Sequence, residues 1–276
     1  MGKMPYCRKC GAELPKDARF CPACGTPIVA AEVKPMETHR TLKVTGKPKV
    51  VVTNTAPGSV EVKTGPEAEV RVDLDLRRPE DLDCNISQDG NAVTITCRSR
   101  APSFLGWPMY FFSAGPRANI LVSVPKEADL NLENRIGGIA LSGVKGDLEA
   151  NSATGRVSVQ DCEGTVKART RTGSVNLENV NGTVSVRNST GSITYSGVLS
   201  KGENWFKTST GSIELALRGK PDLTVEASTR LGRITCSPEL AEARYERGLY
   251  IGRIGAGTGK LIAETKTGNI RISKMS

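Results

Sequence analysis

The sequence predicts an all-β protein whose main part is a parallel β-helix or β-roll solenoid. Two observations predict this class. Glycine is abundant, with 29 among 276 residues, while aromatic residues make up only 4%, a composition that suits many short strands and tight turns. From about residue 136 onward, a glycine followed by a short strand-like run returns roughly every eighteen residues. A separate cluster of four cysteines precedes this part and indicates a second, much smaller domain.

Residues 6–28 read YCRKCGAELPKDARFCPACGTPI and contain two Cys-x2-Cys pairs. Two residues between paired cysteines let both sulfur atoms of one tight turn reach a single metal ion. A glycine follows each pair, Gly11 and Gly25, where it relieves the positive-φ strain that such a turn imposes. The sequence therefore predicts that one zinc ion is held in a closed tetrahedral site by Cys7, Cys10, Cys21 and Cys24.

This segment resembles the short zinc ribbons at the N-termini of many prokaryotic proteins, over about residues 5–28, and we assign residues 1–28 to this domain. A closed site of four thiolates leaves no coordination position for water, so the zinc is expected to be structural rather than catalytic. Metal binding would supply the folding free energy, on the order of 10 kcal/mol, that so short a segment cannot gain from apolar burial. A redox pair of dithiols without metal is the alternative interpretation.

Five cationic residues surround these cysteines: Lys3, Arg8, Lys9, Lys16 and Arg19. They either contact phosphates or offset the negative charge of the zinc-thiolate centre. The second interpretation is favoured, because the only aromatic neighbours, Tyr6 and Phe20, sit beside cysteines, where ribbons place their small core. Nucleic-acid association through the basic ribbon therefore stays an alternative function.

Residues 29–41 carry no sustained hydrophobic period, include Pro35 and mix charges of both signs, so they predict a linker. The only histidine, His39, lies in it and is expected to be solvated rather than a fifth metal ligand. Strand-like alternation starts at about Leu42. The turn at Asp89-Gly90-Asn91, between two alternating runs, predicts a β-hairpin.

Residues 101–117 interrupt the strand pattern with an aromatic segment, APSFLGWPMYFFSAGPR. It holds five of the twelve aromatic residues and three prolines, which disfavour a regular helix. We interpret this segment as an insertion loop that folds back over an open end or side of its own sheet. Contact with a membrane or with a protein partner is the alternative.

A repeat unit of about eighteen residues with two short strands follows. One series of glycines stands before short alternating strands: Gly138, Gly155, Gly173, Gly191, Gly211, Gly232 and Gly268. A second series lies roughly half a period out of phase: Gly146, Gly164, Gly182, Gly219 and Gly259. The spacing of 36 between Gly232 and Gly268 is interpreted as two periods. Units this small cannot bury a face alone, so neighbouring units are expected to stack.

The strands of the first series have apolar residues two and four positions after the glycine: Val157 and Val159, Val175 and Leu177, Ile193 and Tyr195, Ile213 and Leu215. Because side chains alternate along a strand, these residues point to one buried face, while polar residues such as Ser174 and Asn176 point outward. Glycine is expected at the corners, where coils approach closely. An antiparallel β-meander with a hairpin at Asn181-Gly182 satisfies the same parity and is the alternative fold.

The run SVPKEADLNLENRIGGIALSGVKGDLEANSATGRVSV and its continuation to ETKTGNIRI look like the bacterial putative-adhesin family, whose members carry a domain of unknown function made of β-strand repeats. The earlier run VVVTNTAPGSVEVKTG is similar to that family's opening strands, so the resemblance covers about residues 42–273. It implies a right-handed, β-helix-like solenoid with no catalytic residues to transfer. We therefore assign residues 42–276 to one repeat domain.

The remaining cysteines are scattered along strand-like runs: Cys84, Cys97, Cys162 and Cys236. We expect them to be small buried hydrophobic residues in a reducing compartment rather than disulfide partners. The first residues lack the apolar run of a secretory signal, and no later stretch approaches the ~18 apolar residues of a transmembrane helix. The sequence thus predicts a cytoplasmic protein without a transmembrane segment.

Charge and side-chain chemistry favour a binding role over catalysis. The formal net charge is +9, which promotes weak association with anionic surfaces without creating a site. Lys167, Arg169 and Arg171 alternate on one strand and predict a basic patch on one outward face. The acids of the central repeats form no evident catalytic pair: Asp147, Glu149, Asp161, Glu163 and Glu178. Residues 252–260, GRIGAGTGK, lack the spacing of a phosphate-binding loop.

The sequence therefore predicts a non-enzymatic scaffold or protein-interaction module, with a structural zinc ion as its cofactor. Its partner is expected to be an unidentified protein or a second copy of the chain, because an open coil invites end-to-end pairing. A nucleic-acid-associated regulatory protein and a self-assembling or surface adhesin-like protein are the alternatives.

Overall fold

The fold was analysed in a computed structural model, which describes residues 10–13, 20–25, 38–100, 115–237 and 239–275. The chain separates into two compact units, residues 1–36 and residues 37–276. Among the described residues, no helix is long and apolar enough to cross a membrane. The aromatic segment predicted as an insertion loop at 101–117 falls mostly outside the described residues, which resume at Gly115.

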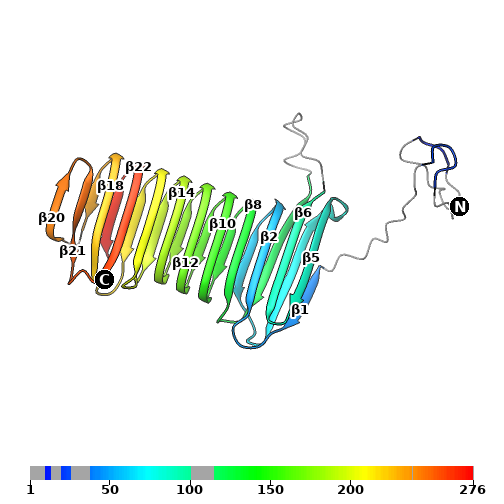
Figure 1. The fold of residues 1–276 in the computed structure, drawn as a ribbon, viewed down its shortest axis with the longest axis horizontal. Helices are drawn as coiled ribbons and strands as arrows, with labels where there is room; N and C mark the ends of the chain where they lie inside the picture. Colours follow the sequence, from blue (N-terminus) through cyan, green and yellow to red (C-terminus); the bar gives the residue numbers. More distant parts are fainter. Residues whose placement is uncertain (1–9, 14–19, 26–37, 101–114, 238, 276) are drawn as a thin grey trace. The chain divides into compact units, whose positions relative to one another are not determined.

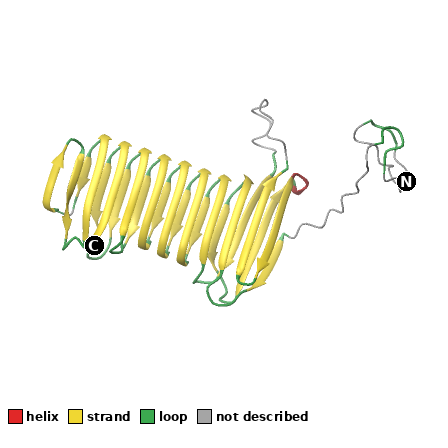
Figure 2. Ribbon diagram, in the orientation of Figure 1, coloured by secondary structure: helices red, strands yellow, loops and turns green. Residues whose placement is uncertain are grey.

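The second unit is a stack of coils in which two β-sheets face each other, and its described part is almost entirely strands and turns (Figures 1 and 2). We call the two sheets the long-strand sheet and the short-strand sheet. The described residues of this unit also include one 3-10 turn, η1 (Pro79–Asp81). The all-β prediction is confirmed.

The long-strand sheet runs in the order β20 (Ala241–Glu246), β21 (Leu249–Ile254), β18 (Leu223–Leu231), β22 (Gly259–Thr267), β16 (Glu203–Thr210), β14 (Asn181–Thr190), β12 (Glu163–Thr172), β10 (Lys145–Thr154), β8 (Asp129–Ile136), β2 (Lys49–Pro57), β6 (Ala92–Ser99) and β5 (Leu82–Asp89). The short-strand sheet runs in the order β1 (His39–Lys43), β4 (Glu69–Arg77), β7 (Arg117–Val124), β3 (Val60–Thr64), β9 (Ile139–Ser142), β11 (Val157–Gln160), β13 (Val175–Glu178), β15 (Ile193–Gly197), β17 (Ile213–Leu217), β23 (Ile270–Lys274) and β19 (Ile234–Cys236).

The central strands pair in parallel, so each repeat is one coil of a solenoid. β12 pairs in parallel with both β10 and β14, which places Gly164 level with Gly146 on one side and with Gly182 on the other. The short strands β11 and β13 pair in the same way. Asn181-Gly182 begins β14 instead of forming a hairpin. The coil prediction is confirmed, and the antiparallel meander is wrong for these repeats.

The predicted inward residues form the core between the two sheets. Val157, Val175, Leu177 and Ile193 are fully buried, and each is level with its counterpart in the next coil. The long strands contribute a second apolar layer in which side chains such as Val186 are also fully buried. Columns of aliphatic side chains thus run the length of the stack and exclude water from its interior.

Glycines mark the corner that leads from each long strand to the following short strand. Gly155 has a φ of 149°, and a Cβ atom there would lie 2.1 Å from the carbonyl oxygen of Gly137 in the neighbouring coil. Only glycine fits so close a backbone contact with this conformation. The equivalent of Gly155 in the preceding coil is Gly137 rather than the predicted Gly138, and the spacing between these corners is therefore the regular eighteen residues.

The coil nearest each end of the chain is inserted between two others. Strands β22 and β23 lie between the coil of β16 and β17 and the coil of β18 and β19. At the other end, β2 lies between β6 and β8, and β3 lies between β7 and β9. Gly268 faces Gly211, and Gly232 faces Gly268, so the coil that ends the chain stacks directly on the coil of Gly211. The 36 residues between Gly232 and Gly268 therefore do not form two successive coils of the stack. The interpretation of this interval as two periods is wrong.

Antiparallel strands flank the parallel stack at both ends. β5 and β6 form the hairpin predicted around Asp89-Gly90-Asn91, with Asp89 level with Ala92. β1 and β4 add antiparallel strands to the short-strand sheet, while β21 and β20 do so at the far end of the long-strand sheet. β1 already begins at His39, inside the predicted linker 29–41, and the exposed His39 ring contacts the Asp73 carboxylate through Nδ1.

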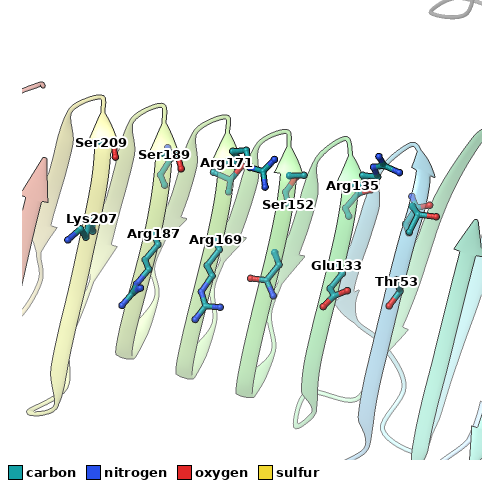
Figure 3. Close-up of a pocket in the computed structure, with 17 residues that line it drawn as sticks. Thr53, Glu133, Arg135, Ser152, Arg169, Arg171, Arg187, Ser189, Lys207 and Ser209 are labelled. Atoms are coloured by element: carbon teal, nitrogen blue, oxygen red, sulfur yellow. The ribbon is translucent and has the colours of Figure 1, made fainter. Parts of the chain in front are cut away.

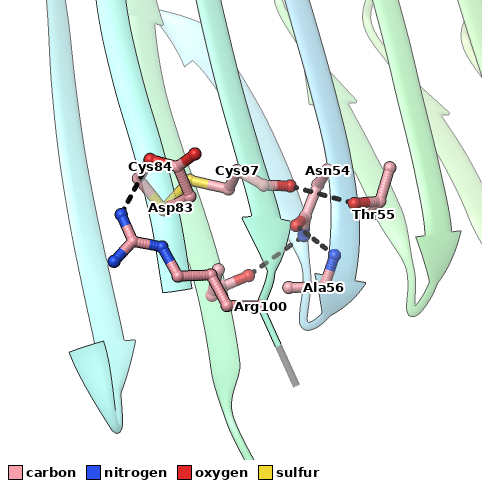
Figure 4. The surroundings of a disulfide bond; sticks show 8 residues. Asn54, Thr55, Ala56, Asp83, Cys84, Cys97 and Arg100 are labelled. Atoms are coloured by element: carbon pink, nitrogen blue, oxygen red, sulfur yellow. Dashed lines mark hydrogen bonds and ion pairs between the residues drawn. A yellow bond between two sulfur atoms is a disulfide. The ribbon is translucent and has the colours of Figure 1, made fainter. Parts of the chain in front are cut away.

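A disulfide bond joins Cys84 of β5 to Cys97 of β6 (Figure 4). The two cysteines face each other across the hairpin, with Cα atoms 4.1 Å apart. The expectation that all scattered cysteines are unbonded is therefore wrong for this pair. Cys162 is a buried thiol, as expected, and burial raises its pKa. Cys236 is half-buried.

Candidate metal centre and basic groove

Three of the four predicted zinc ligands lie together in the N-terminal unit. The sulfur atoms of Cys10, Cys21 and Cys24 all lie within 4.8 Å of one another, and those of Cys10 and Cys21 are 3.6 Å apart. Cys7 lies outside the described residues. Gly11 and Gly25 have φ values of 73° and 67°, as the predicted turns require. The backbone N–H of Gly25 also donates to the carbonyl oxygen of Cys21 at 2.9 Å.

These cysteines fit zinc by their chemistry and by their spacing. Thiolates at about 2.3 Å from a tetrahedral zinc ion are about 3.8 Å from each other, which is close to the separation of Cys10 and Cys21. Three thiolates and a fourth from Cys7 would complete a closed structural site. The role of all four as ligands of one ion stays a prediction.

The acids of the central repeats contact polar or cationic neighbours on the surface. The Glu163 carboxylate lies 3.3 Å from the Lys145 ammonium, and the Asp161 carboxylate accepts a hydrogen bond of 2.6 Å from the Asn179 side chain. Glu149 lies 3.9 Å from the guanidinium of Arg169. Exposed pairs of this kind contribute little to stability and are typical of a solvated surface.

The glycine-rich segment at 252–260 ends in a turn whose backbone donors are already occupied. The N–H groups of Gly257 and Thr258 donate to the Asp222 carboxylate at 2.7 and 3.3 Å, and the Thr258 hydroxyl donates to it at 2.7 Å. These hydrogen bonds, led by that of the Thr258 hydroxyl, lower the pKa of Asp222. The chain's own carboxylate thus takes the place that a phosphate would need, which supports the prediction that this is no phosphate-binding loop.

A groove of about 660 Å³ lies on the outer face of the long-strand sheet (Figure 3). It crosses β2, β8, β10, β12, β14 and β16 near the corner where these strands end. Its five cationic residues are Arg135, Arg169, Arg171, Arg187 and Lys207. Glu133 is the acid that lines it. The groove therefore carries a strong positive charge among the described residues.

The cations form two rows because the strands are in register. Arg169 is level with Arg187, and Arg187 is level with Lys207, so three cations occupy three adjacent strands. Adjacent strands lie about 4.8 Å apart, which sets the spacing of this row. Arg135 and Arg171 belong to the second row, two residues before their corner glycines and two strands apart.

Small side chains create the hollow between these cations. Ala153, Ser189 and Ser209 occupy the same position before the corner glycine as Arg171 does. Two of the cations have acidic neighbours: Arg169 lies 3.9 Å from Glu149, and Lys207 lies 2.7 Å from Glu264. In the part of the chain that the structure describes, Arg135, Arg171 and Arg187 form no ion pair. Their guanidinium groups remain available to a ligand.

Comparison with known proteins identifies both units. Residues 6–28 match the zinc-ribbon domain, and residues 128–273 match the family described as Toastrack DUF4097. The chain belongs to the Toastrack DUF4097 family. A search of curated proteins found no match to the chain.

Two solved structures are similar to the chain. One is a "putative cell adhesion protein" from Clostridium sporogenes, with 9% identity and a TM-score of 0.37, covering 86% of this chain and 99% of its own. The other is a "putative adhesin" from Bacteroides fragilis, with 11% identity and a TM-score of 0.32, covering 86% of this chain and 96% of its own.

The Toastrack solenoid also contains a buried polar column that the sequence reasoning missed. In eight of the long strands a hydroxyl or amide side chain turns inward three positions before the corner glycine, or four positions before it in β2, where the register shifts. The Thr170 hydroxyl donates to the carbonyl oxygen of Gly155 at 3.2 Å, and the Asn188 amide donates to that of Gly173 at 2.8 Å. The column consists of Asn54, Asn134, Ser152, Thr170, Asn188, Thr208, Thr265 and Thr229. These side chains donate hydrogen bonds to the corner carbonyl groups, which would otherwise be buried in an apolar interior without a hydrogen-bond donor.

The predicted basic patch is present but is part of a larger surface. Lys167, Arg169 and Arg171 are all exposed on the outer face of β12, as predicted. The groove extends this patch to cations of neighbouring coils, which lie eighteen or more residues away in sequence. The signal that could have found them is the coil length itself, since Arg187 follows Arg169 by one period.

Proposed function

We propose that this protein is a non-enzymatic binding protein whose Toastrack solenoid presents the basic groove as its ligand surface. The observation that carries the proposal is the line of cations on adjacent strands, held on a stack whose core side chains are buried. A rigid sheet fixes the spacing of its outward side chains, so the groove is organised before a ligand arrives.

The chemistry of the groove supports binding rather than catalysis. Guanidinium groups stay protonated at all physiological pH values, so Arg135, Arg171 and Arg187 can hold an anion but cannot act as general bases. The zinc ribbon is proposed to be a structural unit with one zinc ion, because four thiolates would close the coordination shell. Cytoplasmic location, the domain boundaries and self-association stay predictions.

Site-specific photocrosslinking in the native cell tests this proposal. A photoreactive residue is placed at Ser189 in the groove and, as the matched control, at the exposed Thr194 on the short-strand sheet. We expect a defined adduct at position 189 that disappears when Arg169 and Arg187 are both changed to Ser. Equal labelling at the two positions, or no adduct at position 189, would contradict the groove as the ligand surface.

A further inference from the structure

We propose that the groove binds the sugar-phosphate backbone of single-stranded nucleic acid. This inference rests on the proposed function, because it names the ligand of the same surface. The alternative considered from the sequence used the basic ribbon, the net charge and the patch of Lys167, Arg169 and Arg171; the inference here rests on the groove that several coils form together.

The charge of the groove is the first argument. Five cations and one acid line it, and three of the guanidinium groups form no ion pair with any described residue. An arginine fork matches the oxygen atoms of a phosphate in a bidentate contact, and binding several phosphates releases their counterions. A ligand with several negative charges therefore gains most from this surface.

The arrangement of the cations indicates a linear ligand. Arg169, Arg187 and Lys207 follow one another along the axis of the stack at intervals of about 4.8 Å. The second row runs parallel to the first, two residues nearer the corner, and holds Arg135 and Arg171. The small side chains occupy other positions of this second row, so the hollow lies over it, beside the first row. A polymer with a charge on every unit can lie along this hollow and contact both rows, whereas one small anion would meet only two or three cations.

An aromatic side chain on the same face favours a nucleic acid over other polyanions. Trp205 lies on β16 two residues before Lys207 and points to the outer face, where it is half-buried. It is level with Ile262 of β22, and Ile262 is only 8% exposed although it is also on the outer face. Trp205 and Ile262 are thus neighbours on the outer face of adjacent strands, and part of the Trp205 surface is accessible.

This placement favours a single strand over a duplex. Unpaired bases can stack on an aromatic ring while cations follow the backbone, a combination used by many proteins that bind single strands. In a duplex the bases are stacked between neighbouring base pairs, so their faces are not accessible to an aromatic side chain. The hydroxyl and amide side chains of the groove, such as Ser189, Ser209 and Asn151, add hydrogen-bond donors for phosphate and sugar oxygens.

Fluorescence anisotropy with the full chain and a labelled oligothymidylate of twenty nucleotides tests the inference. We expect binding whose affinity falls with salt, with a contribution of about 0.7 to the slope from each phosphate contact. Arg169→Ser with Arg187→Ser should weaken binding at least tenfold and reduce the slope by about 1.4, for two lost contacts. Trp205→Ala should also weaken binding, and Trp205→Phe should retain most of it.

The matched control removes the same charge from the other sheet. Lys63 and Arg271 are exposed on the outer face of the short-strand sheet, so Lys63→Ser with Arg271→Ser lowers the net charge by the same two units. We expect this control to bind almost as the unchanged protein does. Equal loss in both double variants would show nonspecific charge attraction and would overturn the inference, as would binding that no groove variant affects.

Further ligands separate this inference from the proposed function. Duplex DNA, heparin and polyglutamate are measured against the same variants. If heparin or polyglutamate binds through Arg169 and Arg187 while oligothymidylate does not bind, the nucleic-acid inference fails and the groove remains a ligand surface. If photocrosslinking at Ser189 finds no ligand, the proposed function itself fails. Thermal unfolding of each variant confirms that it is folded before its binding is compared.

Discussion

At the scale of single residues, the corners that lead from the long strands to the short strands combine two structural requirements. The chain there adopts a positive φ, and the neighbouring coil's carbonyl group lies where a Cβ atom would be. Three residues earlier, an inward hydroxyl or amide hydrogen-bonds that same carbonyl group. The repeated phrase Thr-x-Thr-Gly is therefore a structural device for stacking backbones closely.

Replacement of a corner glycine by alanine should destabilise the solenoid strongly. In Gly173→Ala the new Cβ atom would lie 2.0 Å from the carbonyl oxygen of Gly155, at a φ of 144°. We expect a loss of roughly 3 kcal/mol or more in the free energy of unfolding, measured by urea denaturation. The control Gly90→Ala has a φ of 56° but no atom within 4 Å, so it should lose only about 1 kcal/mol. Equal losses would contradict the close contact between coils.

The polar column can be tested without a change of shape. Thr170→Val keeps the volume of the side chain but removes the hydroxyl that donates to Gly155. Because a carbonyl group would lose its partner in the interior, we expect a loss of about 1–2 kcal/mol in the free energy of unfolding. Thr172→Val, at an exposed position of the same strand, should change it by less than about 0.5 kcal/mol. An unchanged free energy of unfolding in Thr170→Val would show that this hydroxyl does not contribute to stability.

Asp222 should make stability depend on pH. Its folded-state pKa is lowered, chiefly by the hydrogen bond from the Thr258 hydroxyl, so its carboxylate stabilises the fold above the unfolded-state pKa of about 3.9. This contribution is lost as the pH falls through the folded-state value. We expect Asp222→Ala to lower the melting temperature at pH 7, and the difference from the unchanged protein to narrow below about pH 4. A constant difference across this range would contradict the role of the charge.

At the scale of elements, the sheet edges differ from the central strands. The central coils are parallel. Antiparallel strands form three of the four sheet edges, β1, β5 and β20, whereas the short-strand sheet ends at β19, which pairs in parallel with β23. On the outermost strand β20, the register shifts between Ala241 and Arg244, and Glu242 has a φ of 54°. A bulge and charged side chains on an edge strand hinder pairing with another sheet. This edge therefore opposes the end-to-end assembly that an open coil would invite.

The hairpin of β5 and β6 should be covalently closed. We expect peptide mapping after alkylation without reductant to find Cys84 linked to Cys97, because the two residues face each other across the hairpin. Cys162 should be alkylated only after unfolding, since its side chain is buried. The control Cys97→Ala should leave Cys84 open to alkylation. Alkylation of both Cys84 and Cys97 in the native protein would contradict the disulfide.

At the scale of the whole molecule, both ends of the Toastrack unit are locked by insertion. A chain that simply wound forward would leave its first and last coils outermost, whereas here β2 with β3, and β22 with β23, each lie between two other coils. These coils are buried on both sides, which protects the ends of the unit from fraying. Contacts between residues far apart in sequence then hold the stack together.

Zinc removal should affect the two units differently. We expect metal analysis to find about one zinc ion per chain, and chelation to unfold the ribbon while the melting transition of the solenoid stays unchanged. Separate transitions follow from the division of the chain into two compact units. Cys21→Ser should reproduce the effect of the chelator. Loss of the main transition on chelation would contradict the independence of the units, and absence of metal in anaerobically purified protein would contradict the zinc site.

Much of the repeat architecture could be predicted from local pattern. The period of two placed Val157, Val175 and Ile193 inside, and the parallel register confirmed the coil length. The disulfide was missed although the predicted hairpin implies it, since pairing Asp89 with Ala92 brings Cys84 opposite Cys97. The polar column was missed because a polar residue at an inward position contradicts the simple alternation on which the prediction rested.

The sequence by itself determined the all-β class, the coil length and the inward side chains, and it predicts the cysteine ligands, because each depends on residues close together in the chain. Only the tertiary structure decided which coils are neighbours, because every coil carries the same glycine and strand pattern and fits against any other. The same is true of the groove. Arg135, Arg171 and Lys207 come from three different coils, and stacking in register is what turns separate surface cations into one surface.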